Sequence, residues 1–248
     1  MQRIFPVALL ALMSAPVTAA QVTVLSAGAI EPGILAAAAA FNRESGHQVK
    51  VTFATAPQLR KRVGGGEAAD VVIAPPAVID EFAKNEKVAA GDRVNVGRVG
   101  VGIAIRQGAP VPDIKTTEAL KRSLGEAGSI VFNQASTGIY VEGLLKKLGV
   151  YDQIQPKIVR YPNGEAVMEH LLKGTKVKEI GFGASTEILL YKGKGLLLVG
   201  PLPADVQNYT MYTAAPMASS PNPPLAQQFV RWLGAPEAQA MFKASGIE

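Results

Sequence analysis

The chain has 248 residues, of which 48% are hydrophobic and only 6% aromatic, so it can bury a sizeable core made mostly of Ala, Val, Leu and Ile. Its formal net charge is +5, with 25 basic and 20 acidic residues and no long charge runs, which excludes the concentrated basic face of a nucleic-acid-binding protein. The sequence contains no cysteine, and this excludes disulfides, cysteine-ligated metal sites, a thiol nucleophile and a lipoprotein anchor.

The first twenty residues have the pattern of a secretory signal peptide. Arg3 precedes an apolar stretch from Ile4 to Met13, and small residues follow before the expected cleavage after Ala19 or Ala20. The apolar stretch is shorter than the ~20 residues that span a bilayer, so an uncleaved membrane anchor is the less favoured interpretation. The sequence therefore predicts a signal peptide over residues 1–20 and a mature protein in the periplasm.

Strands and helices alternate through the first part of the mature chain. The β-branched run "QVTVL" (21–25) predicts a buried strand, and Pro32 favours the first turn of a helix whose apolar residues recur at helical spacing. Further strands are predicted at 47–53 and 71–74, and further helices around 59–63 and 78–85. This alternation predicts an α/β fold with a mainly parallel sheet, in which ligands bind where strand carboxyl ends meet helix N-termini.

A second unit of the same kind follows between two long strands, "GRVGVGIAI" (97–105) and "NYTMYTAAP" (208–216). The elements expected between these strands are, in chain order, a helix at 116–124, a strand at 129–133, a helix at 138–150, a strand at 156–161, a helix at 163–174, and strands at 179–184 and 194–200. Two short amphipathic helices within 224–246 are too small to fold alone, so we expect them to return to the first unit.

These patterns predict two lobes that are joined by two crossing strands. Lobe I is expected from residues 21–103 and 206–248, and lobe II from residues 104–205. A cleft between hinged lobes is a device for closing on a small ligand. No metal or cofactor is predicted, because His47 and His170 match no metal-ligand spacing.

Several segments together carry a resemblance to a known family. They are "VTVLSAGAIEPG", "VTFATAPQLRKRVGGGEAADVVIAPP", "GVGIAIRQGAPVPDI", "STGIYVEGLLKKLGV" and "EIGFGASTEILL". In this order and spacing the chain resembles the periplasmic molybdate-binding protein family of ABC transporters, which has the two-lobed type II periplasmic-binding-protein fold. The resemblance extends over nearly the whole mature chain. It implies a monomeric solute-binding protein that holds a small anion between its lobes and delivers it to an ABC permease and its ATPase.

The sequence departs from this family at the residues that hold the oxyanion. The resemblance implies backbone amides and one serine hydroxyl in each of the first two strand-to-helix turns, whereas this chain has Ala29 in the first turn and Thr55 or Ala56 in the second. The third turn has Ile139 where the family commonly has Arg. Because a tetrahedral oxyanion would lose a hydroxyl donor, we expect a carboxylate or another oxyanion rather than molybdate.

The candidate ligand contacts lie at helix starts in both lobes, where free N–H groups and the helix dipole favour an anion. Small residues in the first turn allow close approach. "TAPQ" (55–58) has the form of a capping box, and Arg60 could pair with a carboxylate one turn further on. "NQASTGIY" (133–140) offers a hydroxyl cap followed by a glycine. The expected ligand contacts are Gly28, Ala29, Thr55, Ala56, Arg60, Ser136, Thr137, Gly138, Gly164 and Phe182.

An enzyme on the same scaffold is the alternative. The family is similar to a periplasmic aconitate isomerase, and moving a proton next to a carboxylate needs a general base beside the substrate carbon. Glu31, Tyr140 and Glu165 are the candidates for this base. Glu31 would compete with a bound anion unless it faces away or is protonated. Tyr161, Tyr209 and Tyr212 are expected to be ordinary strand residues.

Overall fold

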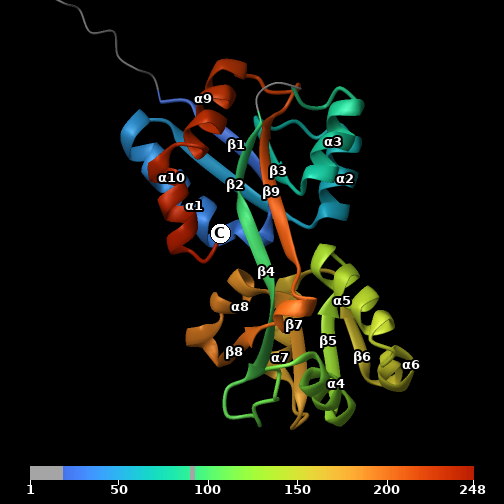
Figure 1. Cartoon of the computed structure of the whole chain (residues 1–248). Helices are drawn as coiled ribbons and strands as arrows, with labels where there is room; N and C mark the ends of the chain where they lie inside the picture. The colour runs from blue at the N-terminus through green and yellow to red at the C-terminus, as the bar shows by residue number, and fades with distance from the viewer. Residues whose placement is uncertain (1–18, 90–92) are drawn as a thin grey trace, which may run out of the picture.

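The computed structural model describes residues 19–89 and 93–248, which form two α/β lobes stacked one above the other (Figure 1). Residues 1–18 of the predicted signal peptide lie outside the described part of the chain. Within the described part, no helix has the length and apolar character needed to cross a membrane.

Lobe I is built from three consecutive strand–helix units. Its elements are β1 (Gln21–Ala27), the 3₁₀ helix η1 (Gly28–Ile30) that leads into α1 (Glu31–Ser45), β2 (Gln48–Ala54), α2 (Ala56–Gly64), β3 (Val71–Ala74) and α3 (Pro76–Lys84). Strand β1 pairs in parallel with β2 on one side and with β3 on the other. The carboxyl ends of these strands, and hence the starts of the helices that follow, point toward the second lobe (Figure 1).

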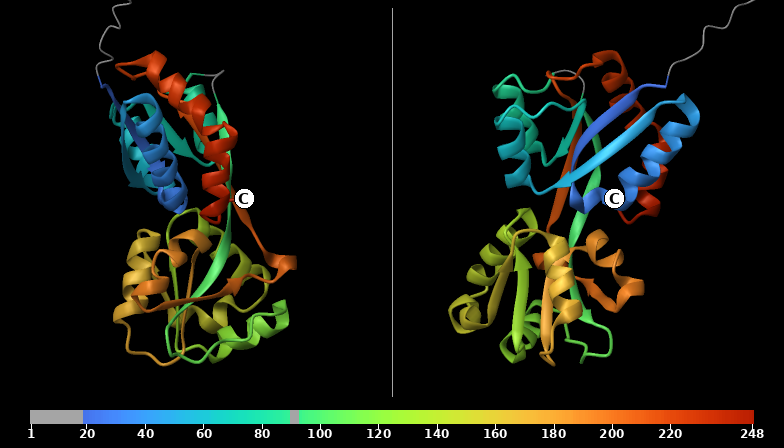
Figure 2. Two further views of the ribbon diagram at one scale, coloured as in Figure 1. Left: turned by 90° about the vertical axis from the view of Figure 1, so that its left-hand side faces the viewer. Right: turned by 180° about the vertical axis from the view of Figure 1, so that it is seen from behind.

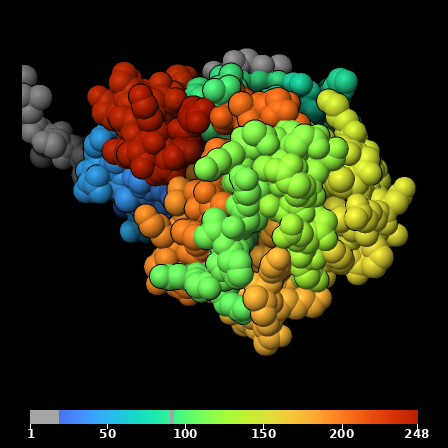
Figure 3. All heavy atoms as spheres, turned by 60° about the horizontal axis from the view of Figure 1, so that its bottom comes forward, coloured from blue at the N-terminus to red at the C-terminus, as the bar shows by residue number. Residues whose placement is uncertain are grey.

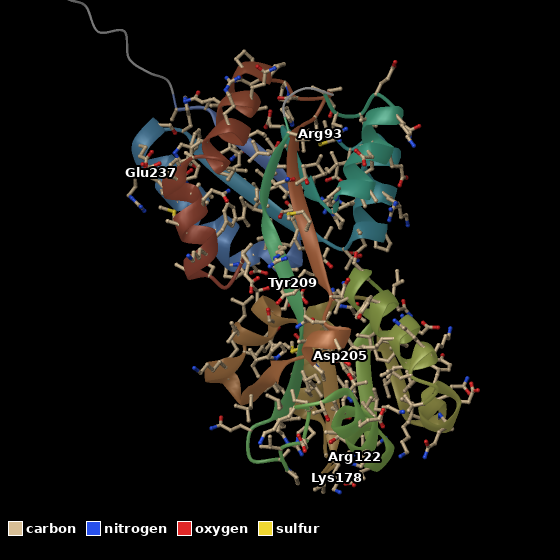
Figure 4. All side chains as sticks on the ribbon, viewed as in Figure 1. Arg93, Arg122, Lys178, Asp205, Tyr209 and Glu237 are labelled. Carbon is tan, nitrogen blue, oxygen red and sulfur yellow. The ribbon has the colours of Figure 1, made fainter. Side chains whose placement is uncertain are left out.

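Two strands cross between the lobes, as predicted. Strand β4 (Val94–Arg106) pairs antiparallel with β9 (Tyr209–Pro216) as far as Gly100, and from Val101 onward it pairs with strands of lobe II. The guanidinium of Arg98 lies over the ring of Tyr209, 4.3 Å from its centroid, at the waist of the molecule (Figure 4). The sheet is mixed rather than mainly parallel, because β9 returns from lobe II in the direction opposite to β4.

Lobe II repeats the strand–helix plan. Its elements are α4 (Thr117–Glu126), β5 (Ser129–Asn133), α5 (Ser136–Lys147), α6 (Tyr151–Ile154), β6 (Ile158–Tyr161), α7 (Gly164–Lys173), β7 (Glu179–Ala184), α8 (Ser185–Leu189) and β8 (Leu196–Pro201). Strand β5 pairs in parallel with β6 and β7, and β4 pairs antiparallel with β7 and β8. Seen from below, these segments make up the end of the molecule (Figure 3).

The C-terminal helices α9 (Pro223–Leu233) and α10 (Pro236–Ala244) pack back on lobe I beside α1, which confirms that the tail returns to the first unit (Figure 2). Their apolar residues share one core with β1 and α1. Phe229 meets Phe41 edge-on, with 5.0 Å between the ring centroids. The predicted strands and helices are present with ends that shift by a few residues, whereas α6 and α8 were not predicted. The two α/β lobes joined by two crossing strands confirm the predicted fold class.

Candidate functional site

A cavity of about 430 Å³ lies between the two lobes. It is lined by the first residues of η1, α1 and α2 from lobe I and of α5 and α7 from lobe II, where the sequence predicted a ligand site. Its volume lies within the range of small-molecule sites. The lining includes seven of the residues expected from the sequence, which are Gly28, Ala29, Thr55, Ala56, Ser136, Thr137 and Gly164.

The start of α5 is capped differently from the sequence prediction. The side-chain oxygen of Asn133 accepts hydrogen bonds from the N–H groups of Ala135 and Gly138, each at 3.0 Å. Ser136 and Thr137 lie in the first turn instead, so the prediction that one of them caps the helix is wrong. Because Asn133 does the capping, both hydroxyl residues are placed in the lining of the cavity.

Helices α2 and α7 begin with side-chain caps. Thr55 and Gln58 form the predicted capping box, in which the hydroxyl of Thr55 accepts from the Gln58 N–H and the Gln58 side chain accepts from the Thr55 N–H at 2.8 Å. The Thr55 hydroxyl keeps its own proton for donation to a ligand. At α7, Asn163 accepts from the N–H of Ala166 at 2.8 Å.

Three of the expected contacts lie outside the cavity lining. Arg60 pairs on the surface with Glu81, with 2.6 Å between Nε and Oε2. Phe182 is buried in the core of lobe II and packs edge-on against Phe132. Gly138 packs closely against the backbone of Asn133, because a Cβ added there would lie 2.6 Å from the Asn133 carbonyl carbon.

The cavity carries more negative than positive side chains. Within residues 19–89 and 93–248, the lining includes the carboxylates of Glu31, Glu165 and Glu187 but only one cationic side chain, Lys194. Burial, and then the charge of Glu165, raise the pKa of Glu31 above its usual value, while Lys194 opposes the shift. Glu31 lines the cavity rather than facing away from it, so in its ionised form it would compete with a bound anion, as expected from the sequence.

Glu187 is the residue of the site that sequence analysis missed. A Cβ added at Gly28 in lobe I would lie 3.3 Å from its Oε1, and one added at Gly164 in lobe II would overlap its carboxylate, at 2.6 Å from Cδ. The carboxylate thus lies against the backbone of both lobes, in space that only glycines leave open. Burial raises the pKa of Glu187 to about 7; the charge of Glu31 adds to this, and a hydrogen bond with the Ala184 backbone opposes it.

Two neighbours of Glu187 help to form this part of the cavity. Thr186, fully buried, donates a hydrogen bond from its hydroxyl to the carbonyl of Ala29, which ties α8 of lobe II to the first turn of lobe I. Tyr212, expected to be an ordinary strand residue, lies in β9 and lines the cavity. Burial is the main cause that raises its pKa, and the charge of Glu187 adds to it.

The histidines and the remaining base candidate lie elsewhere. The ring of His170 bridges the Tyr161 hydroxyl at 2.7 Å and the Glu179 carboxylate at 2.9 Å. The hydroxyl of Tyr140 donates to the carbonyl of Val206 at 2.7 Å, and Tyr140 is not part of the cavity lining. The described residues contain no group of His, Asp or Glu that could hold a metal ion.

Comparisons with known proteins agree with this architecture. The family model described as bacterial extracellular solute-binding protein matches residues 22–248. The chain is 30% identical to an aconitate isomerase from Pseudomonas sp over 250 residues, which covers 96% of this chain and 93% of that protein. It is 22% identical to the molybdate-binding protein ModA of Escherichia coli K12, covering 92% of this chain and 88% of that one.

A solved structure shows the same fold. The periplasmic molybdate-binding protein of Azotobacter vinelandii superposes with a TM-score of 0.75 at 19% identity, over 92% of this chain and 98% of that one. The family model matches nearly all of the described chain, and the two-lobed architecture fits it. The chain therefore belongs to the bacterial extracellular solute-binding protein family.

Proposed function

We propose that this chain is a periplasmic solute-binding protein of an ABC transporter and that it binds a small anion between its lobes. The observation that carries the proposal is the convergence of helix starts from both lobes on one cavity. Each start supplies N–H donors and partial positive charge. An anion that bridges both lobes stabilises the closed arrangement, and a permease with its ATPase would then receive the closed complex.

The lining favours an organic carboxylate over a tetrahedral oxyanion. Ala29 supplies no hydroxyl, whereas the amide side chains of Gln58, Asn133 and Asn163 line the cavity and can orient an extended polar ligand. The cavity also has apolar walls from Phe53 and Pro75, which suit the carbon skeleton of an organic acid. The volume of about 430 Å³ leaves room for such a skeleton.

Titration calorimetry on the mature protein tests this function. The probes are citrate, tricarballylate, both aconitate isomers, molybdate, tungstate, sulfate and phosphate. We expect one site per chain and the tightest binding for a polycarboxylate. Binding of molybdate or tungstate alone would contradict the carboxylate assignment, and the absence of binding by every probe would contradict the anion site itself.

The variant Lys194→Met should weaken binding of a polycarboxylate by about 10-fold, because it removes the only cationic side chain among the described lining residues. Lys192→Met is the matched control, since Lys192 lies in the same short 3₁₀ helix (Lys192–Lys194) but outside the lining. We expect the control to change the affinity less than about twofold. Equal affinities of the two variants would place Lys194 outside the site.

A second candidate function is isomerisation of an aconitate-like acid. Glu187 favours it, because a carboxyl group that titrates near pH 7 beside an anion site suits a general base. In such a reaction the base removes a proton from the carbon beside one carboxylate, the double bond shifts, and a proton returns to the other end of the allylic system. Glu31 and Glu165, two of the base candidates from the sequence, also line the cavity.

Proton NMR of each aconitate isomer in deuterated buffer separates the two functions. An isomerase at catalytic concentration converts one isomer into the other and introduces deuterium, and Glu187→Gln should lower that rate by about 100-fold or more. Lys192→Met should keep the wild-type rate. A solute receptor binds its ligand stoichiometrically and forms no product. An unchanged substrate spectrum would therefore contradict the isomerase function.

A further inference from the structure

The carboxylate of Glu187 occupies the place that an anion must also reach. It lies between the backbone at Gly28, which follows β1, and the backbone at Gly164, where α7 begins. A ligand anion drawn to either helix start therefore meets this carboxylate at close range. Glu187 belongs to α8. The preceding residue, Thr186, donates a hydrogen bond to the Ala29 carbonyl, and this bond holds the backbone that carries Glu187 in position.

The ionisable groups that line the cavity around Glu187 supply little positive charge to stabilise its carboxylate. They come from α1, α7, the segment after α8, the 3₁₀ helix η3 (Lys192–Lys194) and β9, and they are Glu31, Glu165, Tyr191, Lys194 and Tyr212. Among these described residues Lys194 alone is cationic, against three carboxylates when Glu187 is counted. Two ionised groups a few ångströms apart in a partly buried site repel strongly, so an anion and an ionised Glu187 disfavour each other there.

We propose that Glu187 enters the ligand complex as the neutral acid, so that the site takes up its anion together with one proton. The neutral carboxyl can then donate a hydrogen bond to the anion instead of repelling it. This inference rests on the proposed anion-binding function and adds a proton requirement to it. The inference also distinguishes two classes of ligand. Binding of an anion that accepts a hydrogen bond is coupled to proton uptake, whereas binding of a cationic amine would favour ionised Glu187 and would be coupled to proton release.

The direction of the pH dependence follows from the free protein, in which the pKa of Glu187 is about 7. Below pH 6 the carboxyl is already protonated, so its protonation costs the complex nothing and the affinity does not vary with this group. Above pH 7 the proton must be taken from solvent, and the decrease in affinity approaches tenfold for each pH unit. Between pH 6 and pH 8.5 the dissociation constant should therefore rise by about 30-fold.

The experiment measures tricarballylate and sulfate binding to the mature protein by calorimetry at pH 6.0, 7.0 and 8.5, in buffers with different ionisation enthalpies. Tricarballylate is a saturated tricarboxylate, so it cannot isomerise during the measurement. We expect uptake of close to one proton at pH 8.5 in the wild type. Glu187→Gln keeps the size and a hydrogen-bond donor without the charge, so it should bind more tightly than wild type at pH 8.5. Glu169→Gln is the control, because Glu169 is an exposed residue of the same helix α7 outside the cavity lining, and it should keep the wild-type pH dependence.

The outcomes separate this inference from the proposed function. The ionisation of the probe is the same for every variant, so the difference between wild type and Glu187→Gln isolates Glu187. Anion binding without proton uptake in the wild type, which needs no variant, would overturn the inference and leave the anion site standing. An unchanged pH slope in a folded Glu187→Gln variant would assign the proton to another group. Failure of both proteins to bind either anion at any pH would instead overturn the proposed function.

Discussion

The variant Gly138→Ala should be less stable than the wild type by about 3 kcal/mol or more. A Cβ added at Gly138 would overlap the carbonyl group of Asn133, at 2.6 Å from its carbon, and would lie 2.8 Å from the side-chain oxygen that caps α5. The carbonyl is backbone at the end of strand β5, so it cannot move aside as the tip of a flexible side chain would. The clash must separate α5 from β5, and with it Ser136 and Thr137 leave their places in the cavity.

Gly143→Ala is the matched control for this variant. Gly143 lies in the same helix, is exposed, and has no neighbour within 4 Å of an added Cβ. Alanine there should raise the stability by about 0.5 to 1 kcal/mol, because glycine is a poor helix former. Urea denaturation followed by circular dichroism measures both variants. If Gly138→Ala were as stable as Gly143→Ala, that result would contradict the close packing of Gly138 against Asn133.

The fold was predictable from the sequence where local signals agree with tertiary packing. Strand β3 was predicted at its observed bounds, Val71–Ala74, because four apolar residues end at Pro75 and Pro76, which cannot continue a strand. The return of α9 and α10 to lobe I followed from their apolar faces, which the short tail cannot bury alone. Helix α8 was missed because its five residues are too few to show a helical period.

The backbone groups of the candidate site were predictable from the sequence, whereas most of its side-chain contacts were not. Every helix start leaves N–H groups free, so Gly28 and Gly164 could be identified from the strand-to-helix turns alone. Arg60 forms an ion pair with Glu81 of α3, 21 residues further along the chain, and no spacing rule predicts that pair. Glu187 reaches both lobes only because α8 packs against η1. The available signal was its position in the first turn after the carboxyl end of β7, where ligands of such sheets bind.

The variant Asp70→Asn should lower the stability of the protein by about 2 to 3 kcal/mol without changing ligand affinity. Asp70 is only 2% exposed, and its carboxylate accepts hydrogen bonds from the Thr23 N–H at 2.7 Å, the Thr23 hydroxyl at 2.8 Å and the Ser220 hydroxyl at 2.6 Å. These bonds join β1 to the segment between β9 and α9. An amide of the same shape turns an NH₂ group toward at least one donor, which leaves buried polar groups unsatisfied.

Asp80→Asn is the control for Asp70→Asn, because it removes a carboxylate that is 58% exposed and pairs with Arg93 at 2.5 Å. An exposed pair of this kind contributes less than about 1 kcal/mol, so the control should unfold close to the wild-type denaturant concentration. Asp70 lies outside the cavity lining, and the folded Asp70→Asn protein should therefore bind tricarballylate with wild-type affinity. A loss of affinity in that variant, measured where it is fully folded, would mean that the buried network of lobe I also positions the helix starts of the site.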